Sequence, residues 1–364
     1  MKKALVVLLA LTAVAGLAFA QDAPVWTWGF AVNTGFEVKM GDSTSVPKPT
    51  IKLWETIDTT AAPTHARFTG AVAMGDFGAH FYLQFPSDTT ILFLGAPSGI
   101  VVFSNWWVTA NLFDKMVQIN AGAMDNAFSG TKNKGYGGTS PAGVQVVVMP
   151  IDGLKVGVAL PILESTITVP QSNILENQFK AIQVGAFYTM PDTATFALTY
   201  VNAKNVLGAA PLDKSGEFDF GVNVLAIPNL TAQLEGNLAN LGDSALSKYV
   251  LFLNLAYKMD SLTPALAVTG TIPGDKAVVP GGQIIAINPS IDYVVMPGTA
   301  VGLSFTYQMN DTGATSSGIT IDPYVKCTLD AKSYIKIDAA YGIADISKSG
   351  TWTLPIQVNF GWAY

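Results

Sequence analysis

Four charged residues near the C-terminus lie at even spacings, so their side chains would share one face of a β-strand. They are Asp322, Lys326, Lys336 and Asp338, with a turn signal at Asp330-Ala331-Lys332 between the two pairs. A hairpin that turns near Ala331 places Lys326 opposite Lys336, with both carboxylates nearby. Because two opposed ammonium groups repel each other, the acids must offset them. The pattern predicts either an electric field in front of this face or a ladder of salt bridges along it, and we favour the ladder.

Catalytic and metal chemistry find little support in the sequence. The two histidines, His65 and His80, have no serine and acid at a recognised motif spacing, so a Ser-His hydrolase is not indicated. Cys327 is the only cysteine, which excludes a disulfide within the chain and a thiolate metal site. We therefore expect no enzymatic activity, no metal and no cofactor.

The first twenty residues have the pattern of an export signal. Lys2 and Lys3 precede an apolar core, and residues 18–20, Ala-Phe-Ala, match the cleavage pattern of small residues. We expect residues 1–20 to be removed and residues 21–364 to form one β-domain. That domain has no apolar run long enough for a transmembrane helix, so we expect export without a helical anchor.

The composition excludes some classes of partner. Charged residues make up 13% of the chain and apolar residues 49%. Without Lys2 and Lys3, 18 basic residues stand against 26 acidic ones, a net charge of −8. This acid excess argues against nucleic acid and against anchoring by basic residues at a membrane surface. Few charges without helical spans are typical of a protein whose outer face meets lipid.

Short turn signals, rich in the Pro, Gly, Asn and Asp that tight turns select, recur along the chain at roughly even intervals. They are Gly75-Asp76-Phe77-Gly78, Asp114-Lys115, Pro150-Ile151-Asp152-Gly153, Pro191-Asp192, Pro228-Asn229, Asp260-Ser261, Pro297-Gly298 and Asp330-Ala331-Lys332. Between successive turns lie two alternating runs and a longer polar stretch. The repeating unit is therefore a strand, a long loop, a strand and a tight turn.

This rhythm predicts an all-β fold, a transmembrane antiparallel up-and-down β-barrel with short periplasmic turns and longer extracellular loops. Eight tight turns join sixteen strands, and strands at residues 28–40 and 351–364 bring the expected number to eighteen. Sixteen strands are the alternative if a weak segment such as residues 80–85 is not a full strand. Residues 51–57 also alternate and are compatible with a hairpin inside the first loop.

The two faces of the expected strands differ in polarity. One face carries aromatic and aliphatic side chains, as in Tyr249, Leu251, Leu253, Leu255 and Tyr257, with no charge at mid-strand. The other carries mainly Gly, Ala, Thr, Asn and Gln. A Lys or Arg at the bilayer midplane costs roughly 2 to 4 kcal/mol, so the absence of charge indicates a lipid-facing surface. A soluble sandwich, the alternative, would expose many Lys and Glu.

The polar face also carries the charged residues that we expect to point inward. They are Glu37, Lys39, Arg67, Lys155, Glu217, Asp219, Glu235, Lys258, Asp292, Asp322, Lys326, Lys336 and Asp338. Among these, Arg67, Glu235, Asp292, Asp322, Lys326, Lys336 and Asp338 are the candidate pore-lining residues. Seven acids against six bases predict weak selectivity, tilted towards cations by the negative net charge.

In its export signal, alternating strands, short-turn and long-loop sides and final aromatic residue, the chain resembles bacterial outer-membrane porins over residues 21–364. The resemblance implies that the barrel assembly machinery reads the last strand through Phe360, Trp362 and Tyr364, although porins more often end in phenylalanine. It also implies an outer-membrane protein in contact with lipid, small hydrophilic solutes and ions. The sequence leaves open whether the chain forms a homotrimer.

Eighteen strands tilted by about 40° close on a backbone radius of roughly 18 Å, which side chains cannot fill. We therefore expect a water-filled channel for passive diffusion, and the alternative is a structural or adhesive surface barrel with little conductance. In general porins the third long loop narrows the lumen, and here that loop is residues 126–142. Its Lys132, Lys134 and Tyr136 would line the constriction, although the acidic segment usual in porins is missing.

Overall fold

The computed structural model describes residues 23–41, 50–53, 66–85, 102–125, 139–161, 182–202, 216–241, 247–273, 283–310, 317–330, 333–346 and 352–363. The expected export signal, residues 1–20, lies outside these ranges. The regular elements of the described residues are all strands, twenty in number, in one antiparallel sheet. Within this part of the chain, no helix is long and apolar enough to cross a membrane.

The strands follow one another along the chain with only turns or loops between them. They are β1 (Val25–Gly41), β2 (Thr50–Leu53), β3 (Ala66–Met74), β4 (Phe77–Phe85), β5 (Val102–Leu112), β6 (Val117–Asp125), β7 (Thr139–Val148), β8 (Leu154–Pro161), β9 (Gln183–Met190), β10 (Ala194–Val201), β11 (Glu217–Val224), β12 (Leu230–Ala239), β13 (Lys248–Tyr257), β14 (Leu262–Pro273), β15 (Ile284–Met296), β16 (Thr299–Asn310), β17 (Gly318–Asp330), β18 (Ser333–Ala339), β19 (Tyr341–Ile343) and β20 (Trp352–Ala363).

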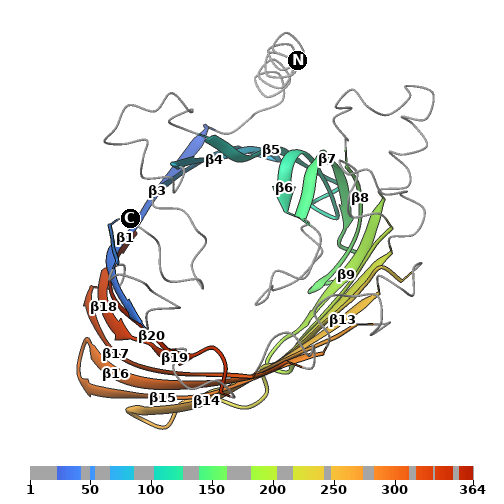
Figure 1. Cartoon of the computed structure of the whole chain (residues 1–364). Coiled ribbons are helices and arrows are strands. Elements are labelled where there is room, and N and C mark those ends of the chain that lie inside the picture. The colour runs from blue at the N-terminus through green and yellow to red at the C-terminus, as the bar shows by residue number, and fades with distance from the viewer. Residues whose placement is uncertain are drawn as a thin grey trace, which may run out of the picture.

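From β3 to β18, each strand pairs with the next strand along the chain, which is the expected up-and-down order. The two ends of the sheet meet at β1. On one side β1 pairs with β3, and on the other it pairs with β20 over eleven residue pairs, from Ala31↔Ala363 to Gly41↔Thr353. Figure 1 shows the strands arranged around a ring, with blue β1 beside red β20.

Twenty strands exceed both the eighteen and the sixteen that the sequence predicts. One reason is β2, a four-residue strand that pairs with β1 inside the expected first loop. The other is the break between β18 and β19, which keep one register against β17, from Tyr324↔Asp338 to Ile319↔Ile343. At the break, the Ala340 amide donates to the carbonyl of Pro355 at 3.1 Å. Pro355 has no N–H to return a bond, so the ladder is interrupted there.

The predicted tight turns are confirmed at seven positions, each between two paired strands. Several need a left-handed backbone, with φ of 54° at Asp192, 64° at Asn229 and 82° at Gly298. Asn and Asp tolerate this conformation, and a Cβ at Gly298 would lie 2.9 Å from the Thr328 carbonyl oxygen. At the eighth turn β17 and β18 pair as expected, while residues 331–332 lie outside the described ranges.

The sheet buries many polar side chains and exposes many large apolar ones. In β7, Gln145 is fully buried, whereas its neighbours Val144 and Val146 are 40% and 39% exposed. The face that carries Gln145, Glu217 and Asp338 is called the inner face, and the opposite face is the outer face. A soluble sandwich would bury its apolar face instead. The predicted apolar outer face is therefore confirmed for the described strands.

Candidate pore lining

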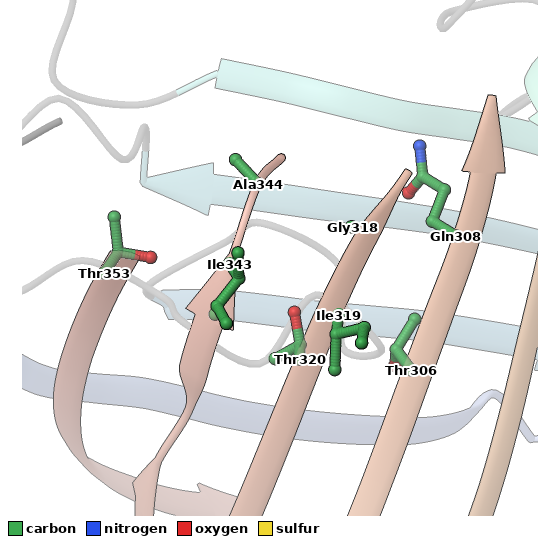
Figure 2. A pocket seen from close by; sticks show the side chains of 9 residues that line it. Thr306, Gln308, Gly318, Ile319, Thr320, Ile343, Ala344 and Thr353 are labelled. Atoms are coloured by element: carbon green, nitrogen blue, oxygen red, sulfur yellow. The ribbon is translucent and has the colours of Figure 1, made fainter. Parts of the chain in front are cut away.

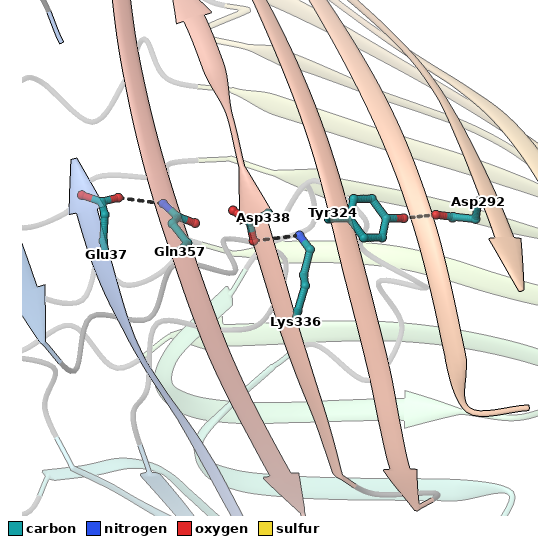
Figure 3. Close-up of polar contacts among 6 residues, drawn as sticks. All are labelled: Glu37, Asp292, Tyr324, Lys336, Asp338 and Gln357. Atoms are coloured by element: carbon teal, nitrogen blue, oxygen red, sulfur yellow. Dashed lines mark hydrogen bonds and ion pairs between the residues drawn. The ribbon is translucent and has the colours of Figure 1, made fainter. Parts of the chain in front are cut away.

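Six neighbouring strands bring a row of inner-face residues into register. Asp292 of β15 lies opposite Gly302 of β16, which lies opposite Tyr324 of β17. The row continues through β18 and β20 to β1, because Tyr324 pairs with Asp338, Asp338 with Gln357 and Gln357 with Glu37. These six residues are called the polar belt, and five of them are drawn in Figure 3 together with Lys336.

Gly302 allows a tyrosine to reach across a strand. The Tyr324 hydroxyl donates a hydrogen bond to Asp292 Oδ1, although β16 separates the two strands (Figure 3). A Cβ at position 302 would lie 2.5 Å from Asp292 Oδ1 and closer still to the Tyr324 ring. Since no real Cβ fits at such a distance, this contact depends on glycine at 302.

The two lysines beside the belt are held by aromatic rings and by one carboxylate. Lys326 faces Lys336 in the register, which confirms the predicted hairpin. Lys336 Nζ lies 3.5 Å from Asp338 Oδ2 and 4.8 Å from the centre of the Tyr324 ring. Lys326 Nζ lies 4.6 Å from the centre of the Tyr334 ring. Cation–π contacts and this ion pair offset the repulsion between the ammonium groups, and the ladder of salt bridges stays a prediction.

At its other end the polar belt joins the first and last strands. Gln357 Nε2 of β20 donates to Glu37 Oε2 of β1 at 2.7 Å (Figure 3). This bond and the backbone register show that the row of inner-face residues continues from β20 to β1. The belt therefore combines charged, amide and aromatic side chains across six strands.

A second inner-face group is acidic and lies on β11 and β12. Glu217, Asp219 and Glu235 are at most 4% exposed, and they are called the acidic patch. The Asn237 amide donates to Asp219 Oδ1 at 2.6 Å. Hydrogen bonds between side chains continue on neighbouring strands, from Asn254 to Gln233 at 3.0 Å and from Asn223 to Thr195 at 3.1 Å. On the inner face, polar side chains are therefore hydrogen-bonded to one another across several strands.

Solved structures with this arrangement are outer-membrane channels. The anion-selective porin from Comamonas acidovorans has a TM-score of 0.54 at 12% identity, with 94% of this chain and 100% of that chain covered. OccK10 (OpdN) from Pseudomonas aeruginosa has a TM-score of 0.58 at 10% identity, covering 93% and 99%. OccAB4 from Acinetobacter baumannii has a TM-score of 0.54 at 10% identity, covering 94% and 99%.

The chain has the fold of a bacterial outer-membrane porin. No protein-family model matches the sequence, and neither does any curated protein. At these identities the likeness concerns the porin fold. It confirms the resemblance that the strand and turn pattern indicates.

Within this porin fold, the predicted pore-lining residues are only partly brought together. Asp292, Asp322, Lys326, Lys336 and Asp338 gather on β15, β17 and β18, whereas Glu235 lies in the acidic patch on β12. The remaining candidate, Arg67, lies in β3 with its backbone paired to Ala31 and Gln84. Their role in lining a pore stays a prediction.

Other predicted site residues fall largely outside the described part of the chain. Lys132, Lys134 and Tyr136 of the expected constriction loop are among them, and so is Tyr364 of the expected assembly signal. Phe360 is described and lies on the outer face, 41% exposed, while the backbone of Trp362 pairs with Val32 and Ser333. The constriction and the assembly signal therefore remain predictions.

Sequence analysis missed the aromatic members of the site. Tyr324 and Tyr334 have the same parity as Lys326 and Lys336, so alternation placed them on the inner face. Attention to charge alone passed over them. Lys248, the first residue of β13, has the parity of buried Val250 and Phe252, so alternation places this charged residue on the inner face as well.

Among the described residues, no group of three or more His, Cys, Asp and Glu side chains is placed to hold a metal ion. The three carboxylates of the acidic patch are among the residues to which this applies. What the inner face offers chemically is therefore a hydrogen-bonding and charged wall, with carboxylates, ammonium groups, amides and phenols in rows across the strands.

Proposed function

We propose that the chain is an outer-membrane porin and not an enzyme. Its inner face would surround a water-filled channel for passive diffusion of small hydrophilic solutes and ions. The observation that carries the proposal is the inverted burial of the sheet, with Gln145, Glu217 and Asp338 buried while Leu303 and Ile337 are exposed. Such a sheet is stable where lipid covers the apolar face and the polar face is turned away from the lipid.

In this proposal the sheet closes into a transmembrane barrel that the chain crosses eighteen times. Counting β18 and β19 once and setting the short β2 aside leaves eighteen of the twenty strands. The eleven residue pairs between β1 and β20 support the closure. With a tilt of about 40°, eighteen such crossings enclose a backbone radius of roughly 18 Å, which is too wide for side chains to fill.

The proposed channel prefers cations weakly. On the described inner face, Glu217, Asp219, Glu235 and Asp338 are buried carboxylates, whereas no described lysine is buried to the same degree. Carboxylates in a partly dehydrated wall create a negative potential that attracts cations. Lys326 and Lys336, beside the belt, are offset by Asp292, Asp322 and Asp338, so the preference is expected to be modest. The anion-selective porin from Comamonas acidovorans shares only the fold at 12% identity.

The outer face would contact outer-membrane lipid. Exposed apolar side chains on β12, β13, β16 and β18, among them Leu234, Leu251, Leu303 and Ile337, support this placement. For β20 we propose that the barrel assembly machinery recognises Phe360, Trp362 and Tyr364 as the strand is folded into the membrane.

The test is the conductance of the refolded chain, residues 21–364, in a planar bilayer. The proposal predicts stable single-channel steps on the nanosiemens scale. A salt gradient should give a small reversal potential of the sign for cations. Protein that is folded, as judged by heat-modifiable gel mobility, but gives no conductance would instead be a structural or adhesive surface barrel. An anionic reversal potential would overturn the selectivity alone.

A further inference from the structure

A hollow of about 300 Å³ lies on the inner face, towards the long-loop ends of β16, β17, β19 and β20. It is separate from the polar belt. Its polar side chains are Thr306, Gln308, Thr320 and Thr353, and Figure 2 shows them around the same depression. The hollow is called the threonine hollow.

The strand register builds this hollow from one row of residues. Thr306 of β16 lies opposite Thr320 of β17, which lies opposite Gly342 of β19, which lies opposite Thr353 of β20. Threonine is favoured in strands because its branched side chain suits a pleated surface. Here all three threonines occupy inner-face positions. Three hydroxyls therefore lie in one row across four strands.

Glycine forms the floor of the hollow. A Cβ at Gly342 would lie 3.3 Å from Thr353 Oγ1 and 3.5 Å from Thr320 Oγ1, so both hydroxyls flank the space that the missing side chain leaves. A Cβ at Gly318 would lie 3.1 Å from the Ile343 carbonyl oxygen and 3.3 Å from that of Ala344. A ligand at this floor would meet hydroxyl groups as well as backbone carbonyl oxygens.

The described lining is uncharged and mixed, with polar side chains beside the apolar Ile319, Ile343 and Ala344. Among the described residues that line the hollow, none is charged. Each threonine hydroxyl both donates and accepts hydrogen bonds, and so does the Gln308 amide. The Asn288 amide donates to Thr306 Oγ1, so this hydroxyl already accepts one hydrogen bond. Anions favour charged donors and metal cations favour carboxylates, so neither matches this lining.

The size of the hollow suits a small molecule rich in hydroxyl groups. At about 30 Å³ for each water, it holds roughly ten waters, which a polyol or one sugar ring would displace. Such a ligand offers the same mixture of donors and acceptors that the displaced waters offered. It therefore loses little hydrogen bonding when it enters.

We propose that the threonine hollow is a binding site for neutral polyols or single sugar rings. The proposal rests on the proposed function in one respect, namely that the inner face lines the channel through which such a solute passes. It adds a neutral class of solute to the ions, whose passage the polar belt and the acidic patch would influence.

Binding can be measured without conductance, by saturation-transfer NMR of D-glucose with the refolded protein in an amine-oxide detergent, which has no sugar headgroup to compete. Wild-type protein should give a saturable signal with half-saturation in the millimolar range. Thr320→Val and Thr353→Val keep the side-chain shape but remove one hydroxyl each. Each should raise the half-saturating concentration roughly two- to tenfold, the range expected for one lost hydrogen bond. Gly342→Ala, which adds a methyl group to the floor, should weaken binding as well.

The matched control is Thr269→Val in β14. Thr269 pairs with buried Phe252 and so lies on the inner face, but it is outside the hollow. Unsaturable glucose signal in the wild type, or equal weakening by Thr269→Val and Thr320→Val, would overturn the proposal. Tighter binding of gluconate or glucosamine than of glucose would overturn its neutral character.

Ion conductance of the same preparation separates this proposal from the proposed function. Conductance without glucose binding would overturn the binding site and leave the porin standing. Glucose binding without conductance would support the site and overturn the channel.

Discussion

The Gly302→Ala substitution tests whether the polar belt depends on a missing side chain. The added methyl group would lie 2.5 Å from Asp292 Oδ1 and closer to the Tyr324 ring, so the ring must move away. Moving it breaks the hydrogen bond from Tyr324 to Asp292 and takes the ring from beneath Lys336 Nζ, which now lies 4.8 Å from its centre. We expect a loss of stability that is specific to this pair of residues.

The size of the loss follows from the contacts. A hydrogen bond to a charged group contributes about 1.5–3 kcal/mol, and an exposed cation–π contact about 0.5–1 kcal/mol. Alanine recovers about 0.5–1 kcal/mol relative to glycine in a strand. Gly302→Ala should therefore lower the free energy of unfolding by about 2 kcal/mol. In a Tyr324→Ala background the methyl group meets no ring, and the Asp292 carboxylate, no longer bonded to the tyrosine, can turn away from it, so the same change should be close to neutral.

Urea unfolding from lipid vesicles, followed by tryptophan fluorescence, measures the four corners of this double-mutant cycle. The control is Gly221→Ala on the same inner face, where a Cβ would meet only Glu235 Cγ at 3.7 Å and Ala197 Cβ at 3.9 Å. It should be neutral or stabilising in either background. If Gly302→Ala costs the same with and without the Tyr324 ring, to within about 0.5 kcal/mol, the two positions are independent and the reasoning is refuted.

Three further predictions concern the two faces and the junction of the chain ends. Leu303→Arg on the outer face should lower the free energy of unfolding from vesicles by roughly 2–4 kcal/mol, whereas Ser304→Arg on the inner face should cost much less. Lys336→Gln removes the cation 3.5 Å from its carboxylate partner, so the reversal potential should move towards stronger cation selectivity. Glu37→Cys combined with Gln357→Cys should cross-link β1 to β20, because these residues are direct register partners.

Each of these predictions has its own control. Asp338→Asn should move the reversal potential in the direction opposite to Lys336→Gln, and a shift of the same sign in both would contradict the electrostatic account. The cross-link is best made in a Cys327→Ser chain, which removes the native thiol. Glu37→Cys paired with Asn359→Cys, offset by two residues, should cross-link poorly. Equal yields from both pairs would contradict the register.

Sequence patterns predicted the features of this fold that are local. Period-two alternation separated the outer residues, such as Leu251 and Leu303, from the inner ones, because each strand is long enough for its faces to differ. A short turn fixes which residues face each other, so Lys326 could be placed opposite Lys336 from the turn near Ala331 alone. The Pro297-Gly298 turn alone would place Asp292 opposite Leu303, but a register shift between Val294 and Met296 places it opposite Gly302, and the sequence pattern does not reveal that shift.

Contacts across long loops could not be predicted in this way. Gly302 lies opposite Tyr324, and residues 311–316 between β16 and β17 set no register that a sequence pattern reveals. The Glu37–Gln357 bond joins residues 320 positions apart, so it depends on the arrangement of the whole sheet. One of the two extra strands has a local cause, the missing N–H of Pro355 opposite Ala340, and the other is the short strand β2.

The central claim is that the inner face of the sheet is the wall of an ion path, and cysteine accessibility along β17 tests it most directly. In a Cys327→Ser chain, single cysteines replace inner-face Asp322 and Lys326 or outer-face Ile321 and Val325, and a cationic, water-soluble thiol reagent is added during single-channel recording. Our account predicts a stepwise fall in current at 322 and 326 and none at 321 and 325. Current changes at the outer positions, or none at the inner ones, would contradict it.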